Sequence, residues 1–151
     1  MTIERQSGTA MVFPGMDPVK FAGVGEFLTF SAHAQKRLKV ADEVLGYALM
    51  DRYRRSADDY DEATQVAFLT ISLALADWAE ESLEVDPESC AGPSFGQRAM
   101  AAHSGALSFA DTVRLTSSSP AARRTISPPS TRTGHTDLPA HAAGTARQDL
   151  R

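Results

Sequence analysis

The sequence predicts an α/β fold for about the first 116 residues, and three stretches carry this prediction. The apolar run 10–13 stops at Pro14 and Gly15, as a buried strand does where a loop begins. Residues 63–83 place apolar side chains at three- and four-residue steps over so wide a face that this helix must be mostly buried. A Gly-x-Ser-x-Gly motif at 92–96 follows the short stretch 89–91, which predicts a brief strand, a sharp turn and a helix.

Composition divides the chain of 151 residues near Thr116. Up to that residue there are 10 Lys and Arg against 17 Asp and Glu, and after it 5 against 2, with no aromatic residue at all. We therefore expect residues 1–116 to form the N-terminal part of a globular domain. Residues 117–151 are expected to be a disordered Ser/Pro/Arg-rich tail, because they offer too few apolar side chains to offset the entropy of ordering. Nucleic acid is an unexpected partner for a globular part that is acidic.

Several features favour a cytoplasmic protein. The single cysteine, Cys90, excludes an intramolecular disulfide and is expected to be a small residue of the strand 89–91. No apolar run reaches the length of a membrane-spanning helix, and the first residues lack the pattern of a secretory signal. We expect neither a membrane partner nor a metal site.

The stretch between the first strand and the long helix is predicted to be helical with interruptions. Residues 25–30 and 32–40 have helical patterns separated by Ser31, a possible cap, and 40–50 form a further amphipathic segment. Residues 51–61 carry many charges with scattered aromatic side chains, which indicates a solvated loop and helix face.

The long helix and the two predicted helices after the serine motif complete the domain. Near the end of the long helix, Trp78 and Leu83 are expected to pack on the domain. Residues 97–103 are rich in helix formers, and Ser108 is a predicted N-cap for a last helix over 109–115.

The Gly-x-Ser-x-Gly motif has the chemistry of a nucleophile held on a tight turn. Ser94 would sit where a strand meets a helix, and Gly92 and Gly96 would let neighbouring backbone pass close to it. Backbone N–H groups at the start of the following helix could then stabilise a developing oxyanion. Plain turns also match this pattern, so the motif alone does not establish a nucleophile.

Five ordered stretches resemble the malonyl-CoA:acyl carrier protein transacylases and the related acyltransferase domains of polyketide synthases. Together they cover about residues 10–116, and they are the following: 12–15 (Val-Phe-Pro-Gly), 41–46 (Ala-Asp-Glu-Val-Leu-Gly), 64–67 (Thr-Gln-Val-Ala), 92–97 (Gly-Pro-Ser-Phe-Gly-Gln) and 105–111 (Gly-Ala-Leu-Ser-Phe-Ala-Asp).

The resemblance implies a partial, truncated α/β-hydrolase-like acyltransferase core. By the same resemblance, Ser94 attacks an acyl-CoA, with malonyl-CoA as the expected substrate, and holds the acyl group as an ester. The ester then passes to the phosphopantetheine thiol of an acyl carrier protein, in fatty acid or polyketide biosynthesis. Backbone N–H groups of Met16 and Phe95 correspond to the oxyanion donors, and no bound cofactor is implied.

The sequence departs from the family at several places. Pro93, Phe95 and Gln97 replace the usual His, Leu and Glu around the serine, and Ser119 stands where the family has a carboxylate-binding arginine. The family's catalytic histidine would fall beyond the last residue, in a chain about half the family's length. We therefore expect an inactive chain whose tail after Thr116 results from a shifted reading frame.

The sequence contains four histidines that are candidates to replace the missing base. His135 and His141 lie in the predicted tail, where nothing would hold them near Ser94. His33 and His103 are expected to be surface or packing residues.

Two other functions are compatible with the same residues. A serine acyl hydrolase would use the same turn and give the acyl group to water. A non-catalytic remnant would dock an acidic carrier protein through a basic face, for which Arg52, Arg54, Arg55 and Arg98 are the candidates.

Overall fold

The structure is a computed structural model that describes residues 8–17 and 19–119. The predicted tail therefore lies outside the described residues from Pro120 onward. The described part contains the following elements: β1 (Ala10–Val12), α1 (Phe21–Phe30), α2 (Ala32–Leu45), α3 (Leu49–Arg55), α4 (Glu62–Ser82), β2 (Ser89–Ala91), α5 (Gly96–His103) and α6 (Phe109–Ser117). Within these residues, no helix is both long and apolar enough to cross a membrane.

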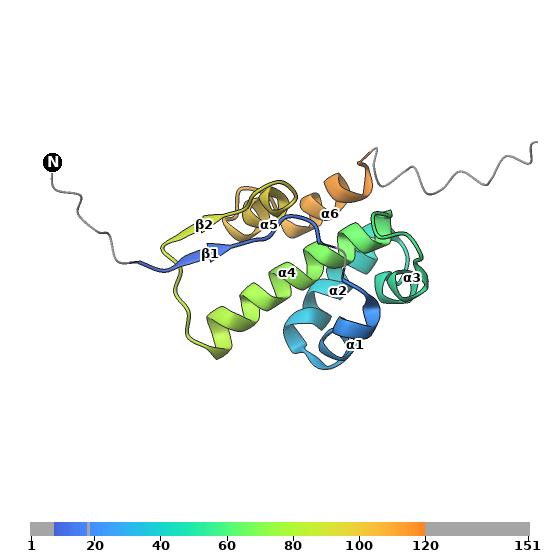
Figure 1. Cartoon of the computed structure of the whole chain (residues 1–151), viewed down its shortest axis with the longest axis horizontal. Coiled ribbons are helices and arrows are strands. Elements are labelled where there is room, and N and C mark those ends of the chain that lie inside the picture. Colours follow the sequence, from blue (N-terminus) through green and yellow to red (C-terminus); the bar gives the residue numbers. More distant parts are fainter. Residues whose placement is uncertain (1–7, 18, 120–151) are drawn as a thin grey trace, which may run out of the picture.

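The two strands form a parallel pair, although four helices separate them in sequence (Figure 1). Met11 lies opposite Cys90, and the N–H of Phe13 donates to the carbonyl of Ala91 at 2.8 Å. A parallel pair requires a long crossover, which α1–α4 provide. The α/β class is thus seen in part: the described residues are mostly helical and hold two strands, so the larger hydrolase-like sheet expected from the resemblance is not seen in them.

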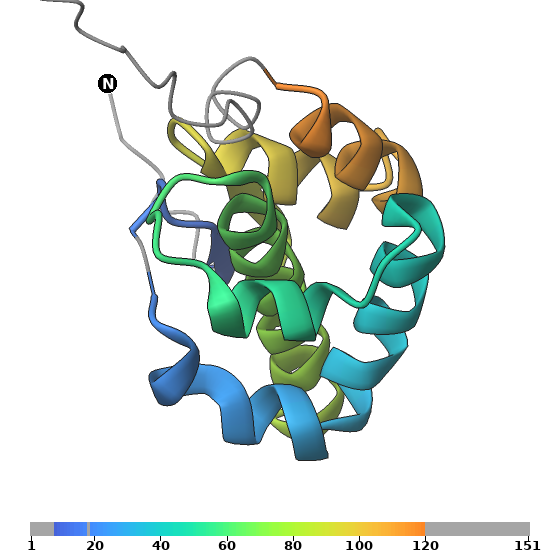
Figure 2. The same cartoon turned by 90° about the vertical axis from the view of Figure 1, so that its right-hand side faces the viewer.

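Helix α4 is the centre of the packing, and Figure 2 shows the other helices around it. Twelve of its residues are buried, including Val66, Leu69 and Leu73, which are fully excluded from solvent. Burial on almost every side explains why its apolar pattern is wide rather than confined to one stripe. Asp61 caps the helix by accepting a hydrogen bond from the N–H of Thr64 at 2.7 Å.

The boundaries of the earlier helices differ from the predicted ones. Helix α2 continues to Leu45 without a break, and it ends at Gly46, whose φ of 74° is the left-handed conformation that favours glycine. Helix α3 supplies the helical part of the stretch predicted as a solvated loop and helix face, but Tyr53 is buried against the core rather than solvated.

Two further expectations are corrected at α4 and α6. Trp78 and Leu83 do not pack fully on the domain, since they are 40% and 57% exposed. Helix α6 is capped by Ser108, as predicted, but it continues to Ser117 because Thr116 is fully buried.

Candidate active site

Ser94 lies on the turn between β2 and α5, with its side chain exposed. Its φ is 52°, a left-handed conformation that a residue with a Cβ rarely adopts. Such strain persists only where the surrounding structure imposes it, and it is common at functional sites. The Gly-x-Ser-x-Gly motif therefore folds as a strained strand-to-helix turn that presents the hydroxyl to solvent.

The two glycines of the motif allow close backbone contacts on both sides of Ser94. A Cβ built on Gly92 would lie 2.2 Å from the carbonyl oxygen of Gly96, and one built on Gly96 would lie 2.3 Å from the carbonyl oxygen of Phe13. Neither contact can be accommodated without a backbone shift. The first glycine thus closes the turn on itself, and the second lets α5 approach the end of β1.

The loop after β1 reaches the same turn. A Cβ built on Gly15 would lie 3.7 Å from the Cβ of Ser94, and Met16 follows directly in this loop with a half-buried side chain. On the other side, α5 begins at Gly96, and the N–H of Gln97 donates to the carbonyl of Ser94 at 3.2 Å. Of the predicted oxyanion donors, Phe95 therefore follows Ser94 directly in the chain, and Met16 follows Gly15, the residue at which the loop approaches Ser94.

The ring of Phe95 makes one aromatic contact and one cation–π contact, and neither was predicted from the sequence. Its ring meets Phe68 of α4 edge-on, with centroids 5.7 Å apart, and the guanidinium carbon of Arg98 lies 4.9 Å above it. Nη1 of Arg98 is buried and has no hydrogen-bond partner among the described residues, and burial lowers the pKa of this arginine. The sequence signal that could have predicted the contact between Phe95 and Arg98 is their i, i+3 spacing in a helix.

Neither histidine of the described part contacts Ser94. Nδ1 of His33 lies 3.7 Å from a carboxylate oxygen of Glu81, and Nε2 of His103 lies 3.3 Å from one of Glu80. The ring of His103 also packs on Phe13. Both imidazoles therefore lie against glutamates of α4, while His135 and His141 lie outside the described residues.

A further group of polar side chains in the described residues lines a hollow that does not include Ser94. A hollow of about 700 Å³ is lined by residues of α2, α4 and α6, including Arg37 and Asp77, and not by Ser94. Arg37 and Asp77 satisfy each other there through two hydrogen bonds of 2.7 Å. In the described part of the chain, no three His, Cys, Asp or Glu side chains are grouped so that they could hold a metal ion.

A parallel strand pair that leads through a strained serine turn into a helix is the arrangement of α/β proteins with a serine elbow. Comparison with known proteins narrows this class. The curated malonyl CoA-acyl carrier protein transacylase of Haemophilus influenzae is 30% identical over 110 residues, which are 70% of this chain and 35% of that protein. No protein-family model matches the chain.

Solved structures give the same result. The MCAT of Streptococcus pneumoniae is 29% identical with a TM-score of 0.64, over 72% of this chain and 36% of that one. A malonyl-transacylase solved in complex with a type II PKS acyl carrier protein is 26% identical with a TM-score of 0.64, over 73% and 37%. The resemblance to malonyl-CoA:acyl carrier protein transacylases is confirmed. The matched part of this chain spans about a third of these relatives' length, which fits an N-terminal part of the family.

Proposed function

We propose that Ser94 is the acyl-accepting residue of a malonyl transfer reaction from CoA to an acyl carrier protein. The observation that carries this proposal is the left-handed backbone of Ser94, at φ 52°, on an exposed turn closed by two close-packed glycines. A non-glycine residue adopts this conformation at a cost in free energy, and the strained turn is what exposes a nucleophile between strand and helix. The similarity to transacylases gives the reaction class.

The reaction has two balanced steps. The Ser94 hydroxyl oxygen attacks the thioester carbonyl of malonyl-CoA, a C–O bond forms, the C–S bond breaks, and CoA leaves as the thiol with the serine proton. The carrier protein's phosphopantetheine thiol then attacks the malonyl ester, a C–S bond forms, the C–O bond to Ser94 breaks, and the proton of the thiol passes to the Ser94 oxygen. Splitting the transfer in this way replaces one difficult displacement by two easier ones.

Backbone donors would stabilise the oxyanion formed in each step. The N–H of Phe95 stands at the start of α5, where the helix dipole is positive, and the loop of Met16 approaches from β1. Because both donors are main-chain groups, the departures from the family at these side chains leave the donors in place.

A base for the Ser94 hydroxyl is missing from the described residues, because His33 and His103 are engaged with glutamates of α4. A serine hydroxyl without a base ionises far above neutral pH and is a weak nucleophile. We therefore propose that the chain by itself is inactive as a transferase, although the turn that presents its nucleophile is formed.

The proposed role of the serine turn can be tested in the absence of a base by replacing the Ser94 hydroxyl with a nucleophile that ionises more readily. A thiol ionises near neutral pH, and more readily at a helix N-terminus. We would compare Ser94→Cys with Ser104→Cys, which places the same thiol at the exposed C-cap of the same helix α5. Both variants would carry Cys90→Ala, so that each has one thiol. The rate of malonyl thioester formation with malonyl-CoA is then followed by intact-protein mass.

We expect Ser94→Cys to be malonylated at least about tenfold faster than Ser104→Cys, since one oxyanion donor alone accelerates acyl transfer by about 100-fold or more. Equal rates would contradict the proposal. The unaltered chain should form no adduct in the same time. A malonyl adduct on it that Ser94→Ala abolishes would support Ser94 as the nucleophile and show that the proposed inactivity is wrong.

A further inference from the structure

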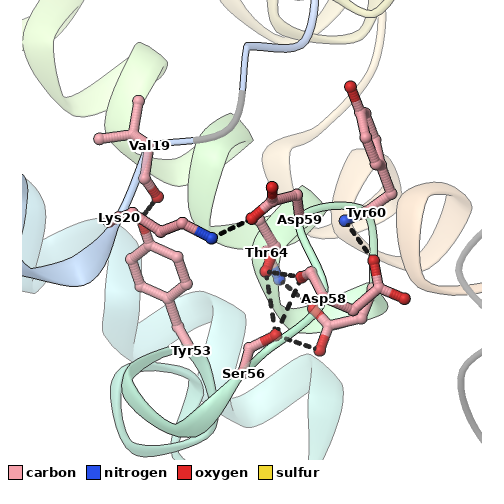
Figure 3. Close-up of polar contacts among 9 residues, drawn as sticks. Val19, Lys20, Tyr53, Ser56, Asp58, Asp59, Tyr60 and Thr64 are labelled. Carbon is pink, nitrogen blue, oxygen red and sulfur yellow. Dashed lines mark hydrogen bonds and ion pairs between the residues drawn. The ribbon is translucent and has the colours of Figure 1, made fainter.

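The loop that carries Met16 is tied down at its far end by a buried tyrosine. Tyr53 of α3 is 5% exposed, and its hydroxyl donates to the carbonyl of Val19, as Figure 3 shows. Its ring also meets Phe21 at the start of α1 edge-on, with centroids 5.9 Å apart. Burial raises the pKa of Tyr53, so the hydroxyl keeps its proton and remains a donor at neutral pH.

A second contact ties the same segment to the loop before α4. Lys20 pairs with Asp59 next to the Tyr53 contact (Figure 3). This pair is largely exposed, at 69% and 45%, and exposed ion pairs contribute little to stability. The buried hydrogen bond of Tyr53 is therefore the stronger of the two ties.

The loop before α4, which contains Asp59, is itself held by side-chain hydrogen bonds. The hydroxyl of Ser56 donates to Asp61 at 2.5 Å, and the hydroxyl of Thr64 donates to the carbonyl of Asp58 at 3.0 Å. Asp61 in turn caps α4, the best-buried helix. The segment at Val19 and Lys20 is thus attached to the loop that caps the well-buried helix α4.

The near end of the loop is fixed by the serine turn. Gly15 lies against Ser94, and the N–H of Phe13 is bonded to β2. Val19 comes only three residues after Met16, a stretch that can span at most about 10 Å. The hydrogen bond from Tyr53 therefore fixes the chain three residues from Met16, whose N–H has to be accurately placed to stabilise an oxyanion.

We propose that Tyr53 is a positioning residue for acyl transfer: its hydroxyl holds the carbonyl of Val19 and thereby keeps the Met16 loop against Ser94. This inference rests on the proposed function. A phenylalanine would fill the same buried space, so the hydroxyl itself is what the proposal concerns.

The test uses Tyr53→Phe in the single-thiol Ser94→Cys background, with Tyr47→Phe as the matched control. The hydroxyl of Tyr47 donates to Glu62 at 2.6 Å, so this control also removes one tyrosine hydrogen bond beside α3, but one that does not involve the Met16 loop. Two rates are measured for each variant: malonylation by malonyl-CoA, which uses oxyanion donors, and alkylation by iodoacetamide, which forms no oxyanion.

We expect Tyr53→Phe to slow malonylation about tenfold while alkylation and the half-saturating malonyl-CoA concentration stay within about twofold, because only transition-state stabilisation is lost. Tyr47→Phe should change neither rate. An equal fall of both rates, or the same fall in Tyr47→Phe, would assign Tyr53 a merely structural role.

Two controls keep the outcome decisive. If Tyr53→Phe fails to fold, Tyr53→Met takes its place in the same background, because it also fills buried space and lacks the hydroxyl; the same selective fall in malonylation is expected, and an unchanged rate would contradict the inference. If Ser94→Cys is malonylated selectively but Tyr53→Phe reacts as fast, this inference alone fails. If Ser94→Cys shows no selectivity over Ser104→Cys, the proposed function fails first.

Discussion

Replacing Gly96 with alanine should destabilise the whole packed unit, because the added methyl meets backbone rather than a mobile side chain. Its Cβ would lie 2.3 Å from the carbonyl oxygen of Phe13 and 2.8 Å from that of Pro14, where ordinary contacts begin near 3.4 Å. Either β1 or α5 must move by about 1 Å, which would disturb the parallel strand pair. Overpacking of this kind costs about 3 kcal/mol. That is a large share of the roughly 5–15 kcal/mol by which domains are stable.

Gly23→Ala is the matched control for this change. Gly23 lies within α1, and a Cβ built there meets nothing within 4 Å. Alanine should stabilise the protein by about 0.5–1 kcal/mol, because glycine costs that much in a helix. Urea unfolding followed by far-ultraviolet circular dichroism gives both free energies. Unfolding midpoints for Gly96→Ala at or above the unaltered chain would refute the packing described for the serine turn.

Two electrostatic predictions concern the same unit. Arg98→Met should leave stability unchanged or raise it, because Nη1 of this half-buried arginine is buried without a hydrogen-bond partner among the described residues. Arg37→Met should instead cost about 1–3 kcal/mol, because Asp77 loses both of its hydrogen bonds. The hydrogen bond from Ser108 holds the pKa of Asp111 below its ordinary 3.8. The stability that Asp111 contributes is therefore fully present above pH 3.8 and is lost as the pH falls through the lower folded value. Urea unfolding of Asp111→Asn and the unaltered chain should converge there, and a gap that widens in acid would contradict this sign.

Local sequence patterns predicted the parts of the fold that depend on local chemistry. The run that ends at Pro14 and Gly15, the short strand before Gly92 and the cap at Ser108 were all visible as breaks in an apolar pattern. The pairing of β1 with β2 was not visible, because hydrogen bonding between residues almost eighty positions apart leaves no periodic signal.

The errors occurred where tertiary contacts outweigh local composition. The charged stretch 51–61 was predicted to be a solvated loop and helix face, and its arginines are exposed on a helix, but Tyr53 turns inward to reach Val19 and Phe21. Trp78 was expected to be packed because tryptophan usually is, yet α4 leaves one side exposed at that position. Neither outcome can be read from the residues' own preferences.

The part of the candidate site that lies within one continuous sequence motif could be predicted. Ser94 and the two glycines were identified together because one turn requires all three. The contacts of Phe68 with Phe95 and of Tyr53 with Val19 were not predicted, because each joins residues that are distant in sequence.

Residue 94 should accept an acyl group from one thiol and give it to another. Malonylated Ser94→Cys can be isolated and mixed with pantetheine, and the protein mass followed together with malonyl-pantetheine. The adduct should disappear as malonyl-pantetheine appears, faster than by hydrolysis and faster than from malonylated Ser104→Cys. Release of free malonate at the same rate with and without pantetheine would instead indicate a hydrolase and rule out the transfer.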